Sequence, residues 1–481
     1  MKQEQQYSLI SLIMLILSIL LLWLVPLNNY GHALLMCGNF IWILHITWKT
    51  ERMTPYFFFL ATFTILFIGG RFWTELLIPN TYSMRRGNFF DETLINRALW
   101  CRSLTYILVF LYYSTLTYIN YPREYKNKPI LCYERKKHLS IDWILIGVLC
   151  IIAPFVLYDV GCKLLMVFTS EDGYLSLYKA QTQHITPGSG IVSSLLYVFF
   201  GIAMLYGNDR IKKLFMLLMF AKSFAFILIG QRAKFGAFML FFLWFYMRKR
   251  KASALGMGVL AVASFFILVF ITTFSAREAT GACSSVPFAG LGRFLYAQGV
   301  SLTTFTFSQQ IESYPTLPYF VSFFPGVASL VSLITPLPPQ EASFAAYLAY
   351  TLNETKYLEG HGLGWTFLSD LYLYSGRTFE FFAFFSVLFG FICAYVEDKS
   401  KTNPFAAVVV YTTFLNLTFL PRAGMYTILP LLVWLGCIYV GIDKLSYAFQ
   451  EAQTFEANKQ TQSDNPNEEQ IENQFIRKRK I

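Results

Sequence analysis

Apolar runs of about the length that crosses a bilayer recur along almost the whole chain. A membrane-spanning helix needs roughly 20 mostly apolar residues. Twelve runs approach that length, at about 7–25, 30–48, 56–74, 98–119, 142–159, 189–206, 214–230, 235–247, 254–274, 378–396, 404–420 and 424–442. The pattern therefore predicts an all-α polytopic membrane protein with about twelve transmembrane helices.

Basic residues between these runs are concentrated in short loops that all fall on one side of the predicted membrane. The loops contain KTER (49–52), residues 123–137, residues 210–213, RKRK (248–251) and Lys399 with Lys401. Because loops rich in Lys and Arg remain in the cytoplasm, this side is the cytoplasm. An even number of spans then puts both termini there. The same bias explains the net charge of +11 without a nucleic-acid partner.

The remaining polar segments divide the chain into its parts. The long outer segments are at about 74–97, 159–188 and 275–377, and the third is one large periplasmic loop. Its apolar stretch 319–334 is interpreted as an interfacial or re-entrant helix, because one extra crossing would leave the chain on the wrong side. Residues 1–446 thus form the transmembrane domain. The polar tail 447–481 is predicted to be disordered in the cytoplasm.

Composition agrees with a membrane location and argues against several kinds of site. Hydrophobic residues make up 55% of the 481 residues and charged residues only 14%, which is too apolar for a soluble protein of this size. The five histidines are scattered, and no Cys/His cluster has metal-ligand spacing. The sequence contains neither a phosphate-binding P-loop nor a dinucleotide fingerprint. We therefore expect no metal and no cofactor.

A second set of cations, nearly all arginine, lies at or near the outer ends of the apolar runs. An arginine near the membrane centre costs roughly 2.5–3.5 kcal/mol on insertion scales, and less near the interface. So many outward cations favour an anionic ligand at the outer surface. Lys222 is a separate case in the middle of its run, and no chemistry is assigned to it. The arginines are Arg71, Arg102, Arg232, Arg277, Arg293, Arg377 and Arg422.

The turn Ile-Gly-Gln-Arg-Ala-Lys-Phe-Gly (229–236) carries two of the candidate ligand-binding cations, Arg232 and Lys234. Its flanking apolar runs are so close that both cations must lie at the membrane surface. One interpretation is an interfacial hairpin whose cations meet lipid phosphates. The other is a phosphate clamp, in which arginine offers paired N–H donors to two oxygens. Gly230 and Gly236 would allow a tight turn.

The large outer loop begins with Phe-Ser-Ala-Arg-Glu (274–278) and continues with Gly-Leu-Gly-Arg-Phe-Leu-Tyr-Ala-Gln-Gly (290–299). Arg277 directly follows a span, and Glu278 is either a general base or the ion-pair neighbour of Arg277. Arg293, Tyr296 and Gln298 recur at helical spacing. Tyr and Gln suit sugar hydroxyl groups, although a helix anchored at the interface would use the same residue types.

Two later segments add candidates for proton transfer and anion binding. Glu-Gly-His-Gly-Leu-Gly-Trp-Thr-Phe-Leu-Ser-Asp-Leu-Tyr-Leu-Tyr-Ser-Gly (359–376) contains His361 and, on a predicted helix, Asp370. His361 either moves protons near neutral pH or is a hydrogen-bonded structural residue. Asp370 is either paired with an arginine or used chemically. The turn Phe-Leu-Pro-Arg-Ala-Gly-Met-Tyr (419–426) presents Arg422 outward.

At these residues the chain resembles the bacterial O-antigen polymerases of the Wzy type. The resemblance lies in the GQRAKFG turn, the FLYAQG segment, the EGHGLGWTFLSDLYLYSG segment and the PRAG turn. The many spans, the single large late loop and the inward termini fit the same plan. One departure concerns an Arg-plus-spaced-Gly pattern of some members, which neither Arg277 nor Arg293 reproduces.

The resemblance implies a GT-C-like, metal-independent glycosyltransferase of the bacterial inner membrane with a periplasmic active site. It would transfer a glycan chain from undecaprenyl pyrophosphate to a lipid-linked repeat unit, with a chain-length regulator as a further partner. Arg232, Arg277 and Arg422 are then expected to hold pyrophosphate, with Arg293 nearby. Glu278, His361 and Asp370 are the candidate bases. The rival interpretations are an O-antigen ligase and a lipid-linked oligosaccharide flippase. A flippase would have short outer loops and charges along several spans.

Overall fold

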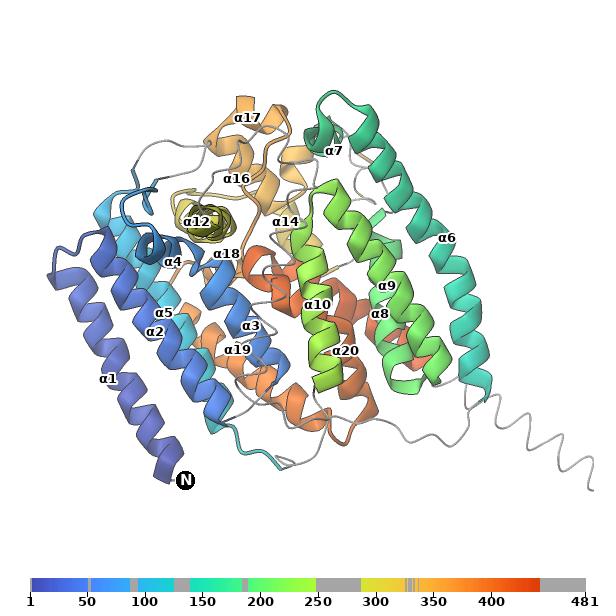
Figure 1. The fold of residues 1–481 in the computed structure, drawn as a ribbon, viewed down its shortest axis with the longest axis horizontal. Coiled ribbons are helices and arrows are strands. Elements are labelled where there is room, and N and C mark those ends of the chain that lie inside the picture. The colour runs from blue at the N-terminus through green and yellow to red at the C-terminus, as the bar shows by residue number, and fades with distance from the viewer. Residues whose placement is uncertain are drawn as a thin grey trace, which may run out of the picture.

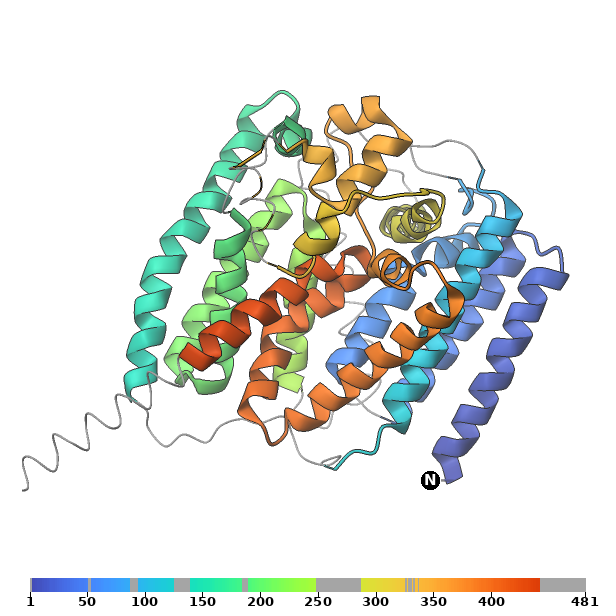
Figure 2. The same ribbon diagram turned by 180° about the vertical axis from the view of Figure 1, so that it is seen from behind.

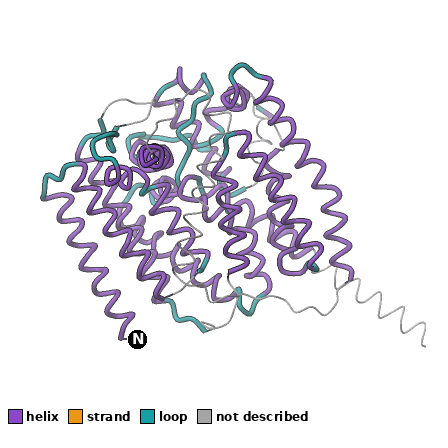
Figure 3. The backbone as a smooth tube through the Cα atoms, in the orientation of Figure 1, coloured by secondary structure: helices purple, strands orange, loops and turns teal. Residues whose placement is uncertain are grey.

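Every regular element in the described part of the chain is a helix, as the sequence predicts (Figure 3). The computed structural model describes residues 2–50, 53–86, 94–124, 139–183, 189–247, 287–324 and 337–441, together with residues 327, 331, 334 and 335. The predicted span 254–274 and the tail 447–481 therefore lie outside the described residues, as does most of the stretch 319–334.

Helices occupy each of the other eleven ranges predicted to span the membrane. They are α1 (Lys2–Leu24), α2 (Asn29–Thr50), α3 (Pro55–Ala61) with the π-helix η1 (Thr62–Phe67) and α4 (Gly70–Leu77), α5 (Arg97–Asn120), α6 (Leu139–Thr169), α8 (Ser189–Tyr206), α9 (Asp209–Ile229), α10 (Arg232–Met247), α19 (Phe379–Lys399), α20 (Pro404–Phe419) and the helix within Met425–Gly441.

Four of the described helices are long and apolar enough by themselves to cross a membrane: Gln5–Leu24, Ile141–Thr169, Phe379–Lys399 and Pro404–Arg422. A fifth candidate is the pair Pro55–Phe67 and Gly70–Leu77, which is bent by 52°. Several of these spans expose large apolar side chains such as Ile16, Phe155 and Phe384, which is the surface expected of a helix in lipid. The protein is therefore all-helical, and a polytopic membrane fold accounts for it.

Helix α6 is longer than the sequence pattern predicts. We expected the fifth span to end near Asp159, because charged residues begin there. The helix instead continues to Thr169. Asp159 and Lys163 lie one turn apart on its surface, with 2.6 Å between the carboxylate Oδ2 and the ammonium Nζ. Because the two charges satisfy each other locally, they do not interrupt the helix.

The large outer segment folds back among the spans instead of forming a separate loop. Its described helices include α12 (Pro287–Gln298), α13 (Val300–Ser308), α16 (Phe344–Leu352), α17 (Glu354–Leu358) and α18 (Phe367–Tyr374). Figure 1 shows α12 end-on, because it runs across the direction of the spans, and α16 and α17 lie above it in this view.

The buried start of α18 reaches the middle of the bundle. The ring of Phe367 lies 4.9 Å from that of Phe110 on α5 and 5.3 Å from that of Phe389 on α19, measured between centroids. Phe110 follows the outer end of α5 by thirteen residues, or about 20 Å at 1.5 Å per residue. Part of the predicted outer loop therefore packs inside the helix bundle, although α18 lies further along the chain than the stretch 319–334 that we interpreted as an interfacial or re-entrant helix.

Segments predicted to lie on the same side of the membrane gather at the same end of the molecule. At the upper end in Figure 1, α17 lies beside α7 (Ser176–Gln183), so two predicted outer segments meet. At the opposite end, Glu397 accepts from the backbone N–H of Tyr56 at 2.9 Å and from the hydroxyl of Tyr118. Figure 2 shows α5 running from this end towards the upper one, with α19 and α20 rising from the same lower end to the middle of the molecule. The alternation of inner and outer segments thus agrees with the predicted order.

Candidate functional site

A short turn after α20 is the centre of the candidate site. Two 3₁₀ helices, η4 (Leu420–Arg422) and η5 (Met425–Thr427), follow α20 and carry the PRAG motif. Pro421 enters the first of them, where a missing N–H does no harm, and Ala423 and Gly424 are extended. The chain therefore changes direction sharply here, with Arg422 on one side of the turn and Tyr426 and Thr427 beyond it.

Asp370 on α18 is hydrogen-bonded to this turn. Its Oδ2 accepts a hydrogen bond from the backbone N–H of Met425 at 2.5 Å, and its Oδ1 accepts one from the Trp365 indole Nε1 at 2.6 Å. The carboxyl group is fully buried. Burial raises the pKa of Asp370 to about 7, and the two hydrogen bonds oppose that rise. Asp370 is therefore bonded to a backbone N–H and an indole rather than to an arginine.

Arg422 and Gln298 meet across the turn, although 124 positions separate them in the sequence. The Arg422 Nη1 donates to the Gln298 side-chain Oε1 over 2.8 Å. Gln298 is the last residue of α12, and both side chains are half-buried. The hydrogen bond brings the predicted FLYAQG and PRAG segments together and leaves further guanidinium N–H donors on Arg422 for a ligand or for the protein.

A cavity of about 320 Å³ opens on the other side of the same turn. This volume falls in the range of small-ligand pockets, roughly 300–1,000 Å³. Its walls come from α8, α9, α10, α20 and the segment after η4. The lining residues are Ser193, Ser194, Tyr197, Met219, Lys222, Ser223, Lys234, Ala237, Leu415, Asn416, Phe419, Ala423, Tyr426, Thr427, Pro430 and Leu431.

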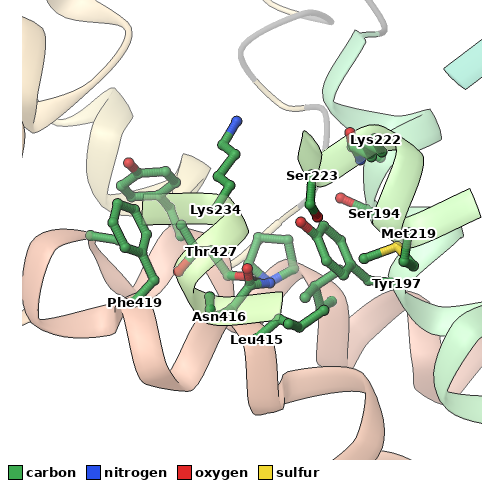
Figure 4. Close-up of a pocket in the computed structure, with 16 residues that line it drawn as sticks. Ser194, Tyr197, Met219, Lys222, Ser223, Lys234, Leu415, Asn416, Phe419 and Thr427 are labelled. Atoms are coloured by element: carbon green, nitrogen blue, oxygen red, sulfur yellow. Dashed lines mark hydrogen bonds between the residues drawn. The ribbon is translucent and has the colours of Figure 1, made fainter. Parts of the chain in front are cut away.

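The cations of this cavity are the two lysines, Lys222 and Lys234. Figure 4 shows them at separate places around it, with Tyr197 and Ser223 between them in this view. Lys222 Nζ donates to Ser193 Oγ at 2.8 Å and lies 5.0 Å from the centroid of the Tyr197 ring. Lys234 Nζ lies 3.9 Å from the centroid of the Phe226 ring. Both ammonium groups thus have an aromatic neighbour, and Lys222 has a hydroxyl partner as well.

The GQRAKFG turn supplies Lys234 to the cavity and Arg232 to the start of α10. Gly230 ends α9 with φ of 99°, a left-handed conformation that favours glycine. The N–H groups of Gly230 and Gln231 then bond back to Ile227 and Phe226, which closes the predicted tight turn. Arg232 is half-buried at the first position of α10 and does not line the cavity.

Tyr296 lies away from the turn, in a contact with the first outer segment. Its ring stacks on Tyr82 with centroids 4.7 Å apart, and its hydroxyl donates to the carbonyl of Ser83 at 3.1 Å. The guanidinium of Arg71 lies over the same ring at 4.5 Å. Arg71 is fully buried and donates to the carbonyls of Met84 and Arg86. The protein itself therefore binds this arginine, for which the sequence favoured an anionic ligand.

The structure shows no contact of Arg293 or His361 with the turn. Arg293 is exposed on α12. His361 follows α17, with its Nε2 3.8 Å from the Glu359 carboxylate, beside the α7 segment. Arg277 and Glu278 lie outside the described residues. Among the described residues, no group of three or more His, Cys, Asp and Glu side chains is arranged to hold a metal ion.

Sequence reasoning missed several residues that shape this region. Trp365 was read only as part of a loop, and Tyr197, Ser193 and Asn416 were read as ordinary members of apolar runs. Asn416 donates to the carbonyl of Thr427 at 3.0 Å, which ties α20 to η5. An amide inside an apolar run was the available signal, because a buried polar side chain needs a partner.

The helical architecture, the apolar outer surface and the cations near one end indicate a multi-pass membrane protein with a cationic candidate site. The family model for the O-antigen polysaccharide polymerase Wzy matches residues 7–447, so the chain belongs to that family. Its function is accordingly the polymerisation of lipid-linked repeat units at the bacterial inner membrane, which sets aside the ligase and flippase interpretations. The chain matches none of the curated proteins and none of the solved structures with which it was compared.

Proposed function

We propose that the protein joins repeat units by glycosyl transfer on the periplasmic face, with both termini in the cytoplasm and about twelve spans. The donor is a glycan chain on undecaprenyl pyrophosphate, and the acceptor is a single lipid-linked unit. An acceptor hydroxyl oxygen attacks the anomeric carbon, the bond from that carbon to the diphosphate oxygen breaks, and the diphosphate leaves with the electron pair. The acceptor proton passes to a base or to solvent.

One observation carries this proposal: cationic side chains from α9, α10 and the η4 turn lie on the two sides of the η4–η5 turn. Arg422 lies on one side of the turn, and Lys222 and Lys234 line the cavity on the other. Negative charge builds on the leaving diphosphate in the transition state, and fixed cations stabilise it there. Arg232, Arg277 and Arg422 are proposed to hold this diphosphate, with Arg293 nearby, and Lys234 is proposed to bind substrate as well.

Tyr296 and Gln298 are proposed to bind substrate from α12. The contact between Gln298 and Arg422 supports a role for Gln298 at the diphosphate. For the base, Glu278, His361 and Asp370 are the candidates from the sequence. Because both oxygens of the buried Asp370 carboxylate already accept hydrogen bonds, a positioning role suits this residue better than proton abstraction. A chain-length regulator is proposed as a protein partner.

The purified protein should polymerise synthetic lipid-linked repeat units at an undiminished rate after treatment with EDTA. Arginine and lysine side chains supply the positive charge that a divalent ion would otherwise bring to the diphosphate. The measurement is the ladder of polymer lengths formed with and without the chelator, with added Mg²⁺ as a control. A loss of more than about tenfold that Mg²⁺ restores would contradict the cation-only mechanism.

A further inference from the structure

Lys222 is a buried lysine in a span, and its surroundings are those of a binding site. It falls seven residues before the outer end of α9, and its exposed fraction is 4%. Its Nζ reaches Ser193 on α8, where the hydroxyl oxygen accepts one of its three N–H bonds. The cavity lies directly beside it and is lined by Ser223, Tyr197 and Asn416 as well. The lysine therefore lies beside a space that both polar and apolar side chains line.

The cavity is lined by two lysines and by no acidic residue. Within the described ranges, neither Lys222 nor Lys234 forms an ion pair with a carboxylate. The nearby charges on α6 are Asp159 and Lys163, which neutralise each other across 2.6 Å. Because an uncompensated buried charge is costly, this arrangement calls for an anion from outside the protein.

The depth of the cavity identifies the kind of anion. Seven residues at 1.5 Å each put Lys222 about 10 Å below the outer end of α9. Lys234 is only two residues into α10, near the membrane surface. The cavity therefore extends from near the membrane surface into the outer part of the hydrocarbon layer, which a group carried on a lipid can reach, whereas an acidic sugar of the repeat unit would lie further out in the periplasm. The depth therefore favours the phosphate groups of a lipid.

The two cation sets around the η4–η5 turn differ in chemistry. Arg422 offers a planar guanidinium with several N–H donors, which matches the oxygens of a group that gains charge as it leaves. The two lysines offer compact charges, which neutralise an anion without that directional fit. Arg232 and Lys234 are two positions apart on α10, so they project from nearly opposite sides of this helix. The same helix can thus serve both sets.

We propose that the Lys222–Lys234 cavity binds the diphosphate of the acceptor lipid, while the guanidinium groups on the other side of the turn bind the diphosphate of the donor. The proposal rests on the proposed function, since polymerisation requires two diphosphate-linked lipids at once. It assigns to Lys222 the role of a buried anchor for the lipid whose bond between sugar and diphosphate is not broken in the reaction. The acceptor sugar then lies above the turn, next to the donor glycan.

Single-round transfer by the full-length protein in nanodiscs tests this assignment. The donor is a preformed long chain, the acceptor is one labelled repeat unit made only of neutral sugars, and each is varied in turn. In Lys222→Met the half-saturating acceptor concentration should rise at least about tenfold. The half-saturating donor concentration and the maximal rate should stay within about threefold. Lys222→Arg, which restores a cation, should recover most of the acceptor binding.

Lys213→Met is the matched control, because Lys213 is exposed near the inner end of the same helix. It should leave both half-saturating concentrations unchanged. An unchanged acceptor value in Lys222→Met, or a rise in the donor value alone, would overturn the assignment. If neutral-sugar acceptors behave alike in both proteins while acidic-sugar acceptors do not, the cavity binds a sugar acid instead of a lipid diphosphate.

Equilibrium binding of undecaprenyl diphosphate without any sugar separates this proposal from the proposed function. The wild-type protein should bind two molecules, and Lys222→Met should bind one of them at least about tenfold more weakly. Unchanged affinity for both molecules in Lys222→Met would refute the cavity as the second site, even if polymerisation proceeds as proposed. Lys234→Met provides a second variant with the same expectation, in case Lys222→Met does not fold.

Discussion

Arg422→Ala should reduce the rate of polymerisation about 10²–10³-fold, the loss typical when one donor to a developing charge is removed. In cells, long-chain polysaccharide should collapse to one-unit lipopolysaccharide at normal protein levels. The physical reason is the place of the guanidinium: it is half-buried at the η4 turn, oriented by Gln298, beside the region where the diphosphate is proposed to leave. The measurement is the initial rate with purified lipid-linked units, together with the chain-length distribution in cells.

Two further variants make the Arg422 result specific. Arg422→Lys keeps the charge but loses the planar set of donors, so it should retain an intermediate rate, about tenfold below wild type. Arg210→Ala removes an exposed arginine near the inner end of α9 and should have little effect. If Arg422→Ala polymerises at the wild-type rate, Arg422 does not take part in holding the diphosphate.

Asp370→Asn should lower both stability and activity, because the amide can satisfy only one of the two donors that the carboxylate accepts. Its oxygen can accept from Trp365 or from Met425, and its NH₂ group then faces the other N–H. A buried donor left without an acceptor costs about 1–3 kcal/mol. The turn that carries Arg422 should then shift, and a displacement near 1 Å can cost about 10²-fold in rate.

The pH dependence of stability supplies an independent readout for Asp370. Its pKa is about 7 in the folded protein against an ordinary 3.8, so the folded state binds the proton more tightly. The contribution of Asp370 to stability is therefore greatest below about pH 4, falls as the pH rises to about 7 and is constant above that value. Heat-denaturation midpoints between pH 4.5 and 8 should show this decline in the wild type and lose it in Asp370→Asn.

Substrate titrations distinguish a positioning role of Asp370 from a role as base. A base variant would lose the maximal rate at an unchanged half-saturating donor concentration, whereas a displaced turn also raises that concentration. Glu380→Gln is the control, since Glu380 is exposed in the first turn of α19. Wild-type stability, activity and pH dependence in Asp370→Asn would contradict the account of the turn.

The helices were predictable because the length of an apolar run is a local property of the sequence. Eleven of the predicted ranges coincide with helices of the structure. The end of α6 was wrong for a physical reason: Asp159 and Lys163 pair within the helix, so charge there does not signal a loop. The count of twelve spans stays a prediction, and so does the disordered tail.

The site was predictable as a set of motifs but not as a set of contacts. The PRAG and FLYAQG segments were both recognised, yet the hydrogen bond between Arg422 and Gln298 depends on how α12 packs across 124 intervening positions. The partners of Asp370 likewise follow from the re-entry of α18 into the bundle. Arg71 illustrates the opposite case, because backbone carbonyls that no sequence pattern reveals take the place of the expected anion.

Photo-cross-linking tests the central claim most directly, namely that the outward cations surround a lipid diphosphate. The probe is a lipid-linked repeat unit with a photoreactive group on the isoprene next to the diphosphate, bound to the purified protein and mapped by mass spectrometry. The account predicts cross-links within residues 229–236 and 420–427, which compete with undecaprenyl diphosphate. Cross-links confined to α1, α2 or the inner ends of the spans would contradict it.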